Sequence, residues 1–202
     1  MKMKRGFLFF VIPVLLFTAC ASVPRVQRVD PSAQPDLSGN WNANDVRIVC
    51  EDLINKCINS PRVSQAISAR RGRTPFVLVG RFNNESSEHI ETSIISTTME
   101  VAIFNSGRLN FVAGGSTREE LRSERQDQLS NASEATASAL GNETGADFLL
   151  TGTVRIIVDR LDNQTTRTYI VNAEMSDIET TERIWMDQSS IDKIITRPKN
   201  KL

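Results

Sequence analysis

The chain has 202 residues, and its 24 Lys and Arg balance its 24 Asp and Glu, so the formal net charge is zero. This balance gives no sign of the strongly basic face that nucleic-acid binding requires. The length allows one domain with a substantial apolar core.

Residues 1–19 have the pattern of a signal peptide. Lys2, Lys4 and Arg5 precede an apolar run over residues 7–17. That run is about 11 residues long, whereas a membrane-spanning helix needs roughly 20. A basic start, a short apolar core and small residues before a cleavage site are typical of an exported precursor. Removal of the leader takes away its three basic residues, which leaves 21 Lys and Arg against 24 Asp and Glu and a net charge of −3.

The leader ends at a site that predicts lipidation of Cys20. Thr18 and Ala19 are small enough for a peptidase pocket, although Phe17 stands where Leu is more usual. We predict cleavage before Cys20 and acylation of its thiol, and two or three acyl chains would hold the domain at a membrane. An ordinary secretory signal with a chance cysteine, or an uncleaved anchor, is the alternative. Ala21 replaces the Asp that retains many lipoproteins in the inner membrane, which favours the outer membrane.

Residues 20–44 read as a disordered tether that begins with the acylated cysteine. They contain Pro24, Pro31 and Pro35, show no periodicity and have little apolar content. Fully extended, this stretch would reach about 80 Å. We expect Trp41, at its end, to pack onto the domain as a lid rather than to bind a ligand.

The folded domain is predicted over residues 45–195 and begins with a helix. Asn44 or Asp45 could cap it, and Pro61 ends or interrupts it. One apolar stripe recurs at helical spacing: Val46, Val49, Cys50, Leu53, Ile54, Cys57 and Ile58. Cys50 and Cys57 are seven residues apart, or about 10 Å along a helix, which is too far for a disulfide. We expect both to be buried apolar residues.

Arg70, Arg71 and Arg73 surround Gly72 in a basic loop after this helix. Such a cluster is usually a solvated connection between elements. It is also the candidate that the sequence offers for binding an acidic partner.

Strand and helix signals alternate through the middle of the chain. We predict, in order, a strand over 76–82, a helix from Ser86 or Ser87 to about Gly107, a strand over 109–112, a charged helix over 118–128 and a helix over 133–144. The first of these strands is continuously apolar, which favours an interior strand buried on both faces. The Gly-Gly-Ser-Thr loop at 114–117 lacks the lysine and spacing of a phosphate loop, so we expect a turn and a helix cap.

Three strands are predicted in the C-terminal part. Segments 148–158 and 165–178 flank Asp162-Asn163 as a hairpin, and a last strand contains Trp185, which we expect in the core. Residues 196–202 form a basic tail. The order αβαβααβββ predicts an α+β fold in which a small mixed sheet packs against helices and ends in an antiparallel meander.

The chain offers little for catalysis. His89 is the single histidine, so no multi-histidine metal site can form. Nucleophile, zinc-protease and dinucleotide-binding motifs are absent. Glu119, Glu120 and Glu124 interleave with arginines at helical pair spacing, which is typical of a solvated, self-paired face. We therefore predict no catalytic residues, no metal, no cofactor and no small-molecule substrate.

An ordered series of segments resembles a known family. The segments are 38–45, Ser60-Pro61, 79–84, 88–90, 105–107, 145–152 and 179–185. With the lipidation signal they resemble the LpoB family of outer-membrane lipoproteins, over about residues 38–195. The resemblance implies a domain with the fold of the N-terminal domain of TolB, which faces the periplasm and activates a penicillin-binding protein, the peptidoglycan synthase that it binds. The tether is short beside that of the best-known members, and no docking residue of the family can be matched here.

Two other functions are compatible with a small lipid-anchored domain. One is a role in assembly or secretion at the outer membrane, as in CsgG, although this chain lacks the extra alternating stretch that membrane-spanning strands would need. The other is a wall-glycan binding module, which would need exposed aromatic residues. Only one Tyr and two Trp are present.

Overall fold

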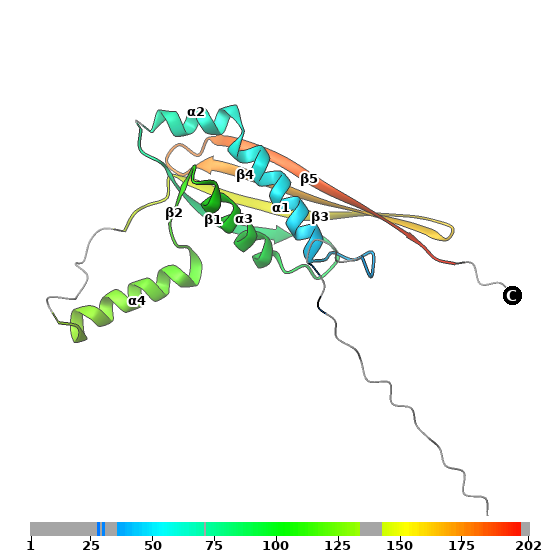
Figure 1. The fold of residues 1–202 in the computed structure, drawn as a ribbon, viewed down its shortest axis with the longest axis horizontal. Helices are drawn as coiled ribbons and strands as arrows, with labels where there is room; N and C mark the ends of the chain where they lie inside the picture. Colours follow the sequence, from blue (N-terminus) through cyan, green and yellow to red (C-terminus); the bar gives the residue numbers. More distant parts are fainter. Residues whose placement is uncertain (1–27, 29, 31–35, 71, 134–142, 199–202) are drawn as a thin grey trace, which may run out of the picture.

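The computed structural model describes residues 28, 30, 36–70, 72–133 and 143–198 (Figure 1). In chain order its elements are α1 (Ala43–Ile58), α2 (Pro61–Ala69), β1 (Phe76–Asn84), α3 (Thr92–Ser106), β2 (Asn110–Phe111), α4 (Gly115–Asn131), β3 (Phe148–Leu161), β4 (Gln164–Asp177) and β5 (Arg183–Thr196). The predicted α+β class is confirmed. Cys20, Arg71 and most of the helix predicted at 133–144 lie outside the described residues.

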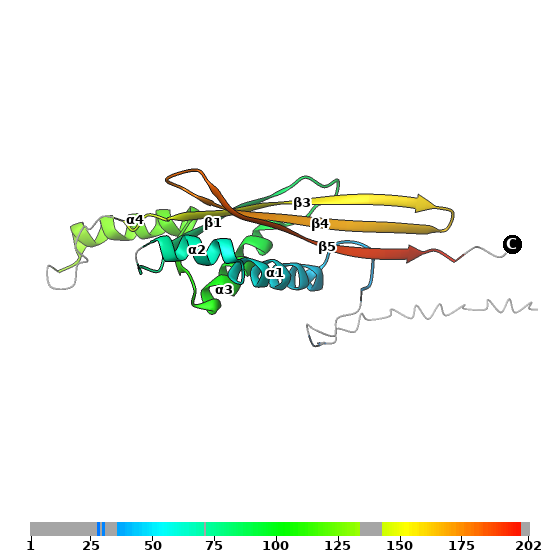
Figure 2. The ribbon, with the colours of Figure 1, turned by 90° about the horizontal axis from the view of Figure 1, so that it is seen from above.

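The five strands form one mixed sheet in the order β2-β1-β3-β4-β5. β1 pairs in parallel with β2 and β3, whereas β3, β4 and β5 pair antiparallel, which confirms the predicted C-terminal meander. The hairpin strands turn at Asp162, whose φ of 51° is left-handed; β3 continues to Leu161, past its predicted end, and β4 covers Gln164–Asp177, one residue earlier than predicted. They extend well past the helices at one end of the molecule (Figures 1 and 2).

The core lies between the sheet and the helices α1, α2 and α3, which cover one face of it (Figure 2). Trp185, Cys50 and Cys57 are buried there, and both cysteines are free thiols, as predicted. Along β1 buried residues alternate with half-buried ones, so the prediction of a strand buried on both faces is wrong. Its interior position in the sheet is right, but among the described residues no helix covers its second face.

Helix boundaries differ from the predicted ones because the capping residues differ. Asn42, not Asn44 or Asp45, caps α1, and Asp45 completes a capping box with it. Pro61 occupies the first turn of a second helix, α2, which the prediction lacked. Glu91 caps α3, so the predicted first turn at residues 86–91 is a loop.

Residues 36–42, which we call the N-terminal strap, lie against the sheet before α1 begins. The buried Lys193 of β5 binds Asp36 at 3.1 Å, the Asn40 carbonyl oxygen at 3.0 Å and Asp45 at 2.6 Å. Trp41 packs on the core with its ring 5.3 Å from that of Tyr169, so the predicted packing of this residue is confirmed. Part of the segment assigned to the tether is therefore fastened to the domain.

α4 extends away from the sheet, and none of its residues is buried (Figure 1). It begins where Gly114 passes Leu78, so close that an added Cβ would lie 2.6 Å from Leu78 Cδ1. Only Gly114 of the predicted 114–117 loop precedes α4, as its N-cap, and no side chain caps the helix, so residues 115–117 form the first turn of the helix rather than a loop. Within the described residues, no helix has the length and apolarity needed to cross a membrane.

Candidate docking face on the open side of the sheet

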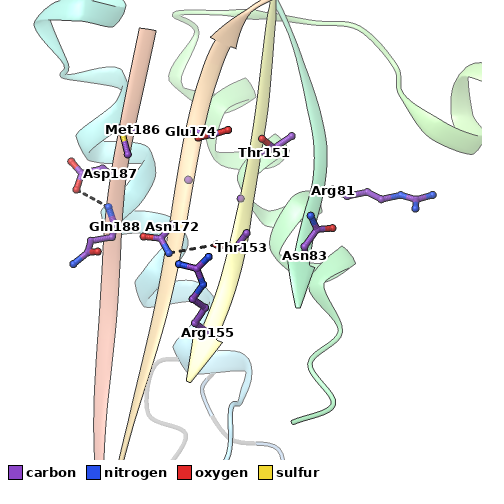
Figure 3. Close-up of a pocket in the computed structure, with 12 residues that line it drawn as sticks. Arg81, Asn83, Thr151, Thr153, Arg155, Asn172, Glu174, Met186, Asp187 and Gln188 are labelled. Carbon is purple, nitrogen blue, oxygen red and sulfur yellow. Dashed lines mark hydrogen bonds between the residues drawn. The ribbon is translucent and has the colours of Figure 1, made fainter. Parts of the chain in front are cut away.

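The sheet face opposite α1, α2 and α3 is hollowed, and we call this surface the open face (Figure 3). The hollow has a volume of about 780 Å³. Its lining residues come from all strands except β2: Arg81, Asn83, Thr151, Gly152, Thr153, Arg155, Asn172, Ala173, Glu174, Met186, Asp187 and Gln188. Most of these side chains are polar.

Strand alternation and register bring these polar side chains together. Successive strand residues point to opposite faces, so the core residues of β3 alternate with residues of the open face. Register then aligns them across the strands: Thr153 pairs with Asn172, which pairs with Gln188. The Asn172 amide donates to Thr153 Oγ1 at 3.5 Å (Figure 3). The result is a row of amide and hydroxyl groups that can donate and accept hydrogen bonds.

Most charged groups around the hollow already have partners. Arg155 Nε lies 2.7 Å from Glu85 Oε2, and Glu174 Oε2 lies 2.9 Å from Arg183 Nε. Asp187 faces the Lys56 ammonium at 3.7 Å. These pairs are largely exposed, so they orient side chains more than they stabilise the fold.

Arg81 is the exception at this surface. Among the described residues its guanidinium makes no hydrogen bond or ion pair, and it extends outward from β1 (Figure 3). The register of β1 on β3 shifts between Val79 and Phe82, and such irregularities re-aim side chains. Gly80, beside it, leaves room for Thr151, whose Cγ2 would lie 2.9 Å from an added Cβ. An open, unpaired cation can therefore meet a carboxylate on another molecule.

The open face carries the chemistry of a binding surface. Its amides, hydroxyls and guanidinium groups recognise polar or acidic groups, but they include no thiol or imidazole nucleophile. In the described part of the chain, no group of three His, Cys, Asp or Glu side chains is placed to hold a metal ion. His89 lies in the loop before α3, beside Glu88, Arg167 and Trp41 of the strap.

The basic loop predicted to bind a partner is engaged within the domain. Arg70 pairs with Asp177 and lies 3.6 Å from Asp147, and Arg73 Nη2 lies 2.5 Å from the same Asp147 carboxylate. Burial raises the pKa of Asp147, but the hydrogen bonds from Arg73 and the Phe76 N–H outweigh it, so its pKa is below the usual value. Arg70 also stacks over Phe148. A role of Arg70, Arg71 and Arg73 in partner binding stays a prediction.

Comparison with known proteins identifies the family. A sequence model described as peptidoglycan-synthase activator LpoB matches residues 45–191. The chain belongs to the LpoB family. The resemblance noted from short segments is thereby confirmed, and LpoB proteins are a family of activators rather than of catalysts. No curated protein sequence matches this chain significantly.

Solved LpoB domains are among the similar structures. The LpoB C-terminal domain from Salmonella enterica is 18% identical, covers 73% of this chain and 98% of its own length, and has a TM-score of 0.44. That from Escherichia coli is 16% identical, with coverages of 74% and 99% and a TM-score of 0.44. Lipoprotein GNA1162 from Neisseria meningitidis is 18% identical, with coverages of 62% and 88% and a TM-score of 0.41.

Proposed function

We propose that this protein is an outer-membrane lipoprotein that binds a penicillin-binding protein through the open face and activates its synthesis of peptidoglycan. The family match supports the role of a synthase activator. The contact surface is inferred from the polar hollow, which no described helix covers, and from Arg81 at its side, which has no partner among the described residues. The sorting signal at Cys20 and Ala21 supports the location at the outer membrane.

The open face suits a contact with a folded partner that presents acidic and amide groups. Complementary charge at such a surface speeds association and selects the partner. The exposed pairs Arg155–Glu85 and Glu174–Arg183 can exchange partners at small cost because water already screens them. The binding energy would come from the hollow's floor, where Thr151, Thr153 and Asn172 lie.

Glycan polymerisation by a cognate synthase, with the acyl-free protein added, tests this function. We expect the rate to rise to a plateau with increasing protein. Arg81→Glu should shift the curve to about tenfold higher concentration, because reversing a charge in a complementary contact weakens association. Thr153→Trp should block the hollow. Arg62→Glu, the same charge change on α2, is the matched control and should leave the curve unchanged.

An unchanged rate at saturating protein would refute the activator role. If activation occurs but Arg81→Glu and Arg62→Glu behave alike, the open face is not the contact. Palmitate labelling of wild type and Cys20→Ala, followed by membrane fractionation, tests the anchor and its membrane. Recovery of secretion components without a synthase in cross-linked cells would move the protein to the assembly class.

A further inference from the structure

The outer side of α3 and the adjoining end of β2 form an apolar groove, which we call the α3–β2 groove. It has a volume of about 330 Å³ and is lined by Val101, Phe104 and Phe111, with Glu100 at its side. Phe104 is 68% exposed and Val101 is 55% exposed, although their surroundings are apolar. The rings of Phe104 and Phe111 are 6.4 Å apart, so they form two aromatic walls.

α3 carries apolar residues on its outer side as well as on the side that packs on the core. Its inner residues Ile95, Met99 and Ile103 are fully buried, yet Val101 and Phe104 on its outer side are apolar as well. Polar residues such as Ser93 and Thr97 lie on this side too, so the exposed apolar residues form a strip rather than a wholly apolar surface. Exposed apolar patches mark sites of contact with another segment or molecule. The outer side of α3 therefore lacks its cover among the described residues.

Glu100 indicates the charge of that cover. It is half-buried beside the aromatic walls, and among the described residues its carboxylate makes no hydrogen bond or ion pair. Burial alone raises its pKa. A carboxylate in such a place favours a cation alongside the apolar group that fills the groove.

The chain itself contains a segment with this chemistry. Residues 23–29 read Val-Pro-Arg-Val-Gln-Arg-Val, in which Val recurs at 23, 26 and 29 and Arg at 25 and 28. This stretch has no helical or strand period, but Val and Arg each recur in it with a period of three. A polyproline II helix has three residues per turn, so it would place the valines on one edge and the arginines on the next. Aromatic-lined grooves are the usual receptors for such helices.

The groove is within reach of this segment. α1 and α3 lie side by side in the same direction, since Cys50 Sγ is 3.9 Å from the Ile95 carbonyl oxygen and Arg108, beyond α3, binds Ser64, beyond α1. Cys50 is level with Ile95, so the rise per residue along the two helices gives the axial position of Phe104. It lies about 24 Å along the helix axis from the start of α1.

The strap fixes the other end of the linker. Asp36 binds the side chain of Asn42, the cap of α1, at 2.5 Å. The ten residues from Val26 to Asp36 can extend over about 33 Å, which exceeds the axial distance to the groove.

We propose that residues 23–29 bind the α3–β2 groove of their own domain, with the valines against Phe104 and Phe111 and an arginine on Glu100. If Cys20 is anchored as in the proposed function, binding leaves about 10 Å of chain between anchor and groove, whereas release frees up to about 55 Å before Asp36. The segment would thus set how far the domain reaches from its membrane.

Disulfide trapping in the acyl-free mature chain, with Cys20→Ser, tests the proposal. Val26→Cys is combined with Val101→Cys at the groove or, as a control, with Leu161→Cys, which is 74% exposed on the hairpin beyond the helices. Burial raises the pKa of Cys50 and Cys57 to about 12, so these thiols do not compete. We expect the groove pair to oxidise about tenfold faster than the control, because binding raises its effective concentration.

Charge reversal provides the specific control. Glu100→Lys should remove the advantage of the groove pair, and Arg25→Glu with Arg28→Glu should restore it in that background. Equal rates for the two pairs, or no effect of Glu100→Lys, would overturn the proposal. Disulfide-linked dimers would instead assign the groove to a second copy. A nitroxide on Val26→Cys, which should broaden the amide signals of residues 100–104, tests the contact without a second cysteine. Neither experiment depends on a synthase, so their failure is separate from failure of the proposed function.

Discussion

Replacing Lys193 by Met should destabilise the domain strongly, because the ammonium holds two carboxylates and the strap. Lys193 and Asp45 side chains are only 6% and 3% exposed, and their Nζ–Oδ2 distance is 2.6 Å. Without the ammonium, the one partner that the Asp45 carboxylate keeps among the described residues is the backbone N–H of Asn42, at 2.9 Å. Removing one member of a buried pair typically costs about 3–5 kcal/mol. Because Asp45 keeps its cap bond and Asp36 is half-exposed, we expect the lower end, about 3 kcal/mol.

Urea unfolding followed by tryptophan fluorescence measures this loss. Lys56→Met is the matched control, since Lys56 binds Asp52 at 2.8 Å at the surface and an exposed pair contributes about 1 kcal/mol or less. Adding Asp45→Asn to Lys193→Met should recover part of the loss, because it removes the unpaired buried charge. Losses of the same size for Lys193→Met and Lys56→Met would refute the buried-pair reasoning.

Three further predictions concern the core. At pH 8, Cys50 and Cys57 should react with an aromatic disulfide reagent only after unfolding, because burial raises their pKa to about 12. Burial and the Glu88 hydrogen bond raise the pKa of Tyr169 to about 12. In the unfolded chain the tyrosine hydroxyl ionises near pH 10. The free energy of unfolding should therefore fall as pH rises from 10 towards 12, because the unfolded state loses this proton first. Thermal melts of wild type and Tyr169→Phe over this pH range measure the effect. Gly152→Ala should lower the melting temperature, because an added Cβ would lie 2.2 Å from an aromatic carbon and 2.4 Å from a carbonyl oxygen, whereas Gly145→Ala has open space and should be nearly neutral.

Local sequence patterns predicted the elements that depend on neighbouring residues alone. The apolar stripe of α1 identified its buried face, and the Asp162-Asn163 turn between alternating segments identified the hairpin. A proline after an apolar helical stripe indicates the end of that helix, but it fits equally well in the first turn of the next, which is why the sequence did not reveal α2.

The candidate docking face required information that a single sequence does not contain. Thr153, Asn172 and Gln188 are far apart in the chain and become neighbours only through the register of three strands. Alternation at 149–155 could have indicated a polar face on β3, but not which residues lie opposite. The basic loop was the conspicuous candidate from sequence because its arginines are adjacent; their carboxylate partners at 147 and 177 are distant in the chain.

The strap has a practical consequence for anyone who expresses this domain. The family match begins at residue 45, but the chain is packed against the sheet from Asp36 onward. A fragment that starts at residue 45 would lack the cap Asn42, the Trp41 ring on Tyr169 and one of the carboxylates on Lys193. Weak activation by such a fragment would then report a damaged fold rather than a poor regulator.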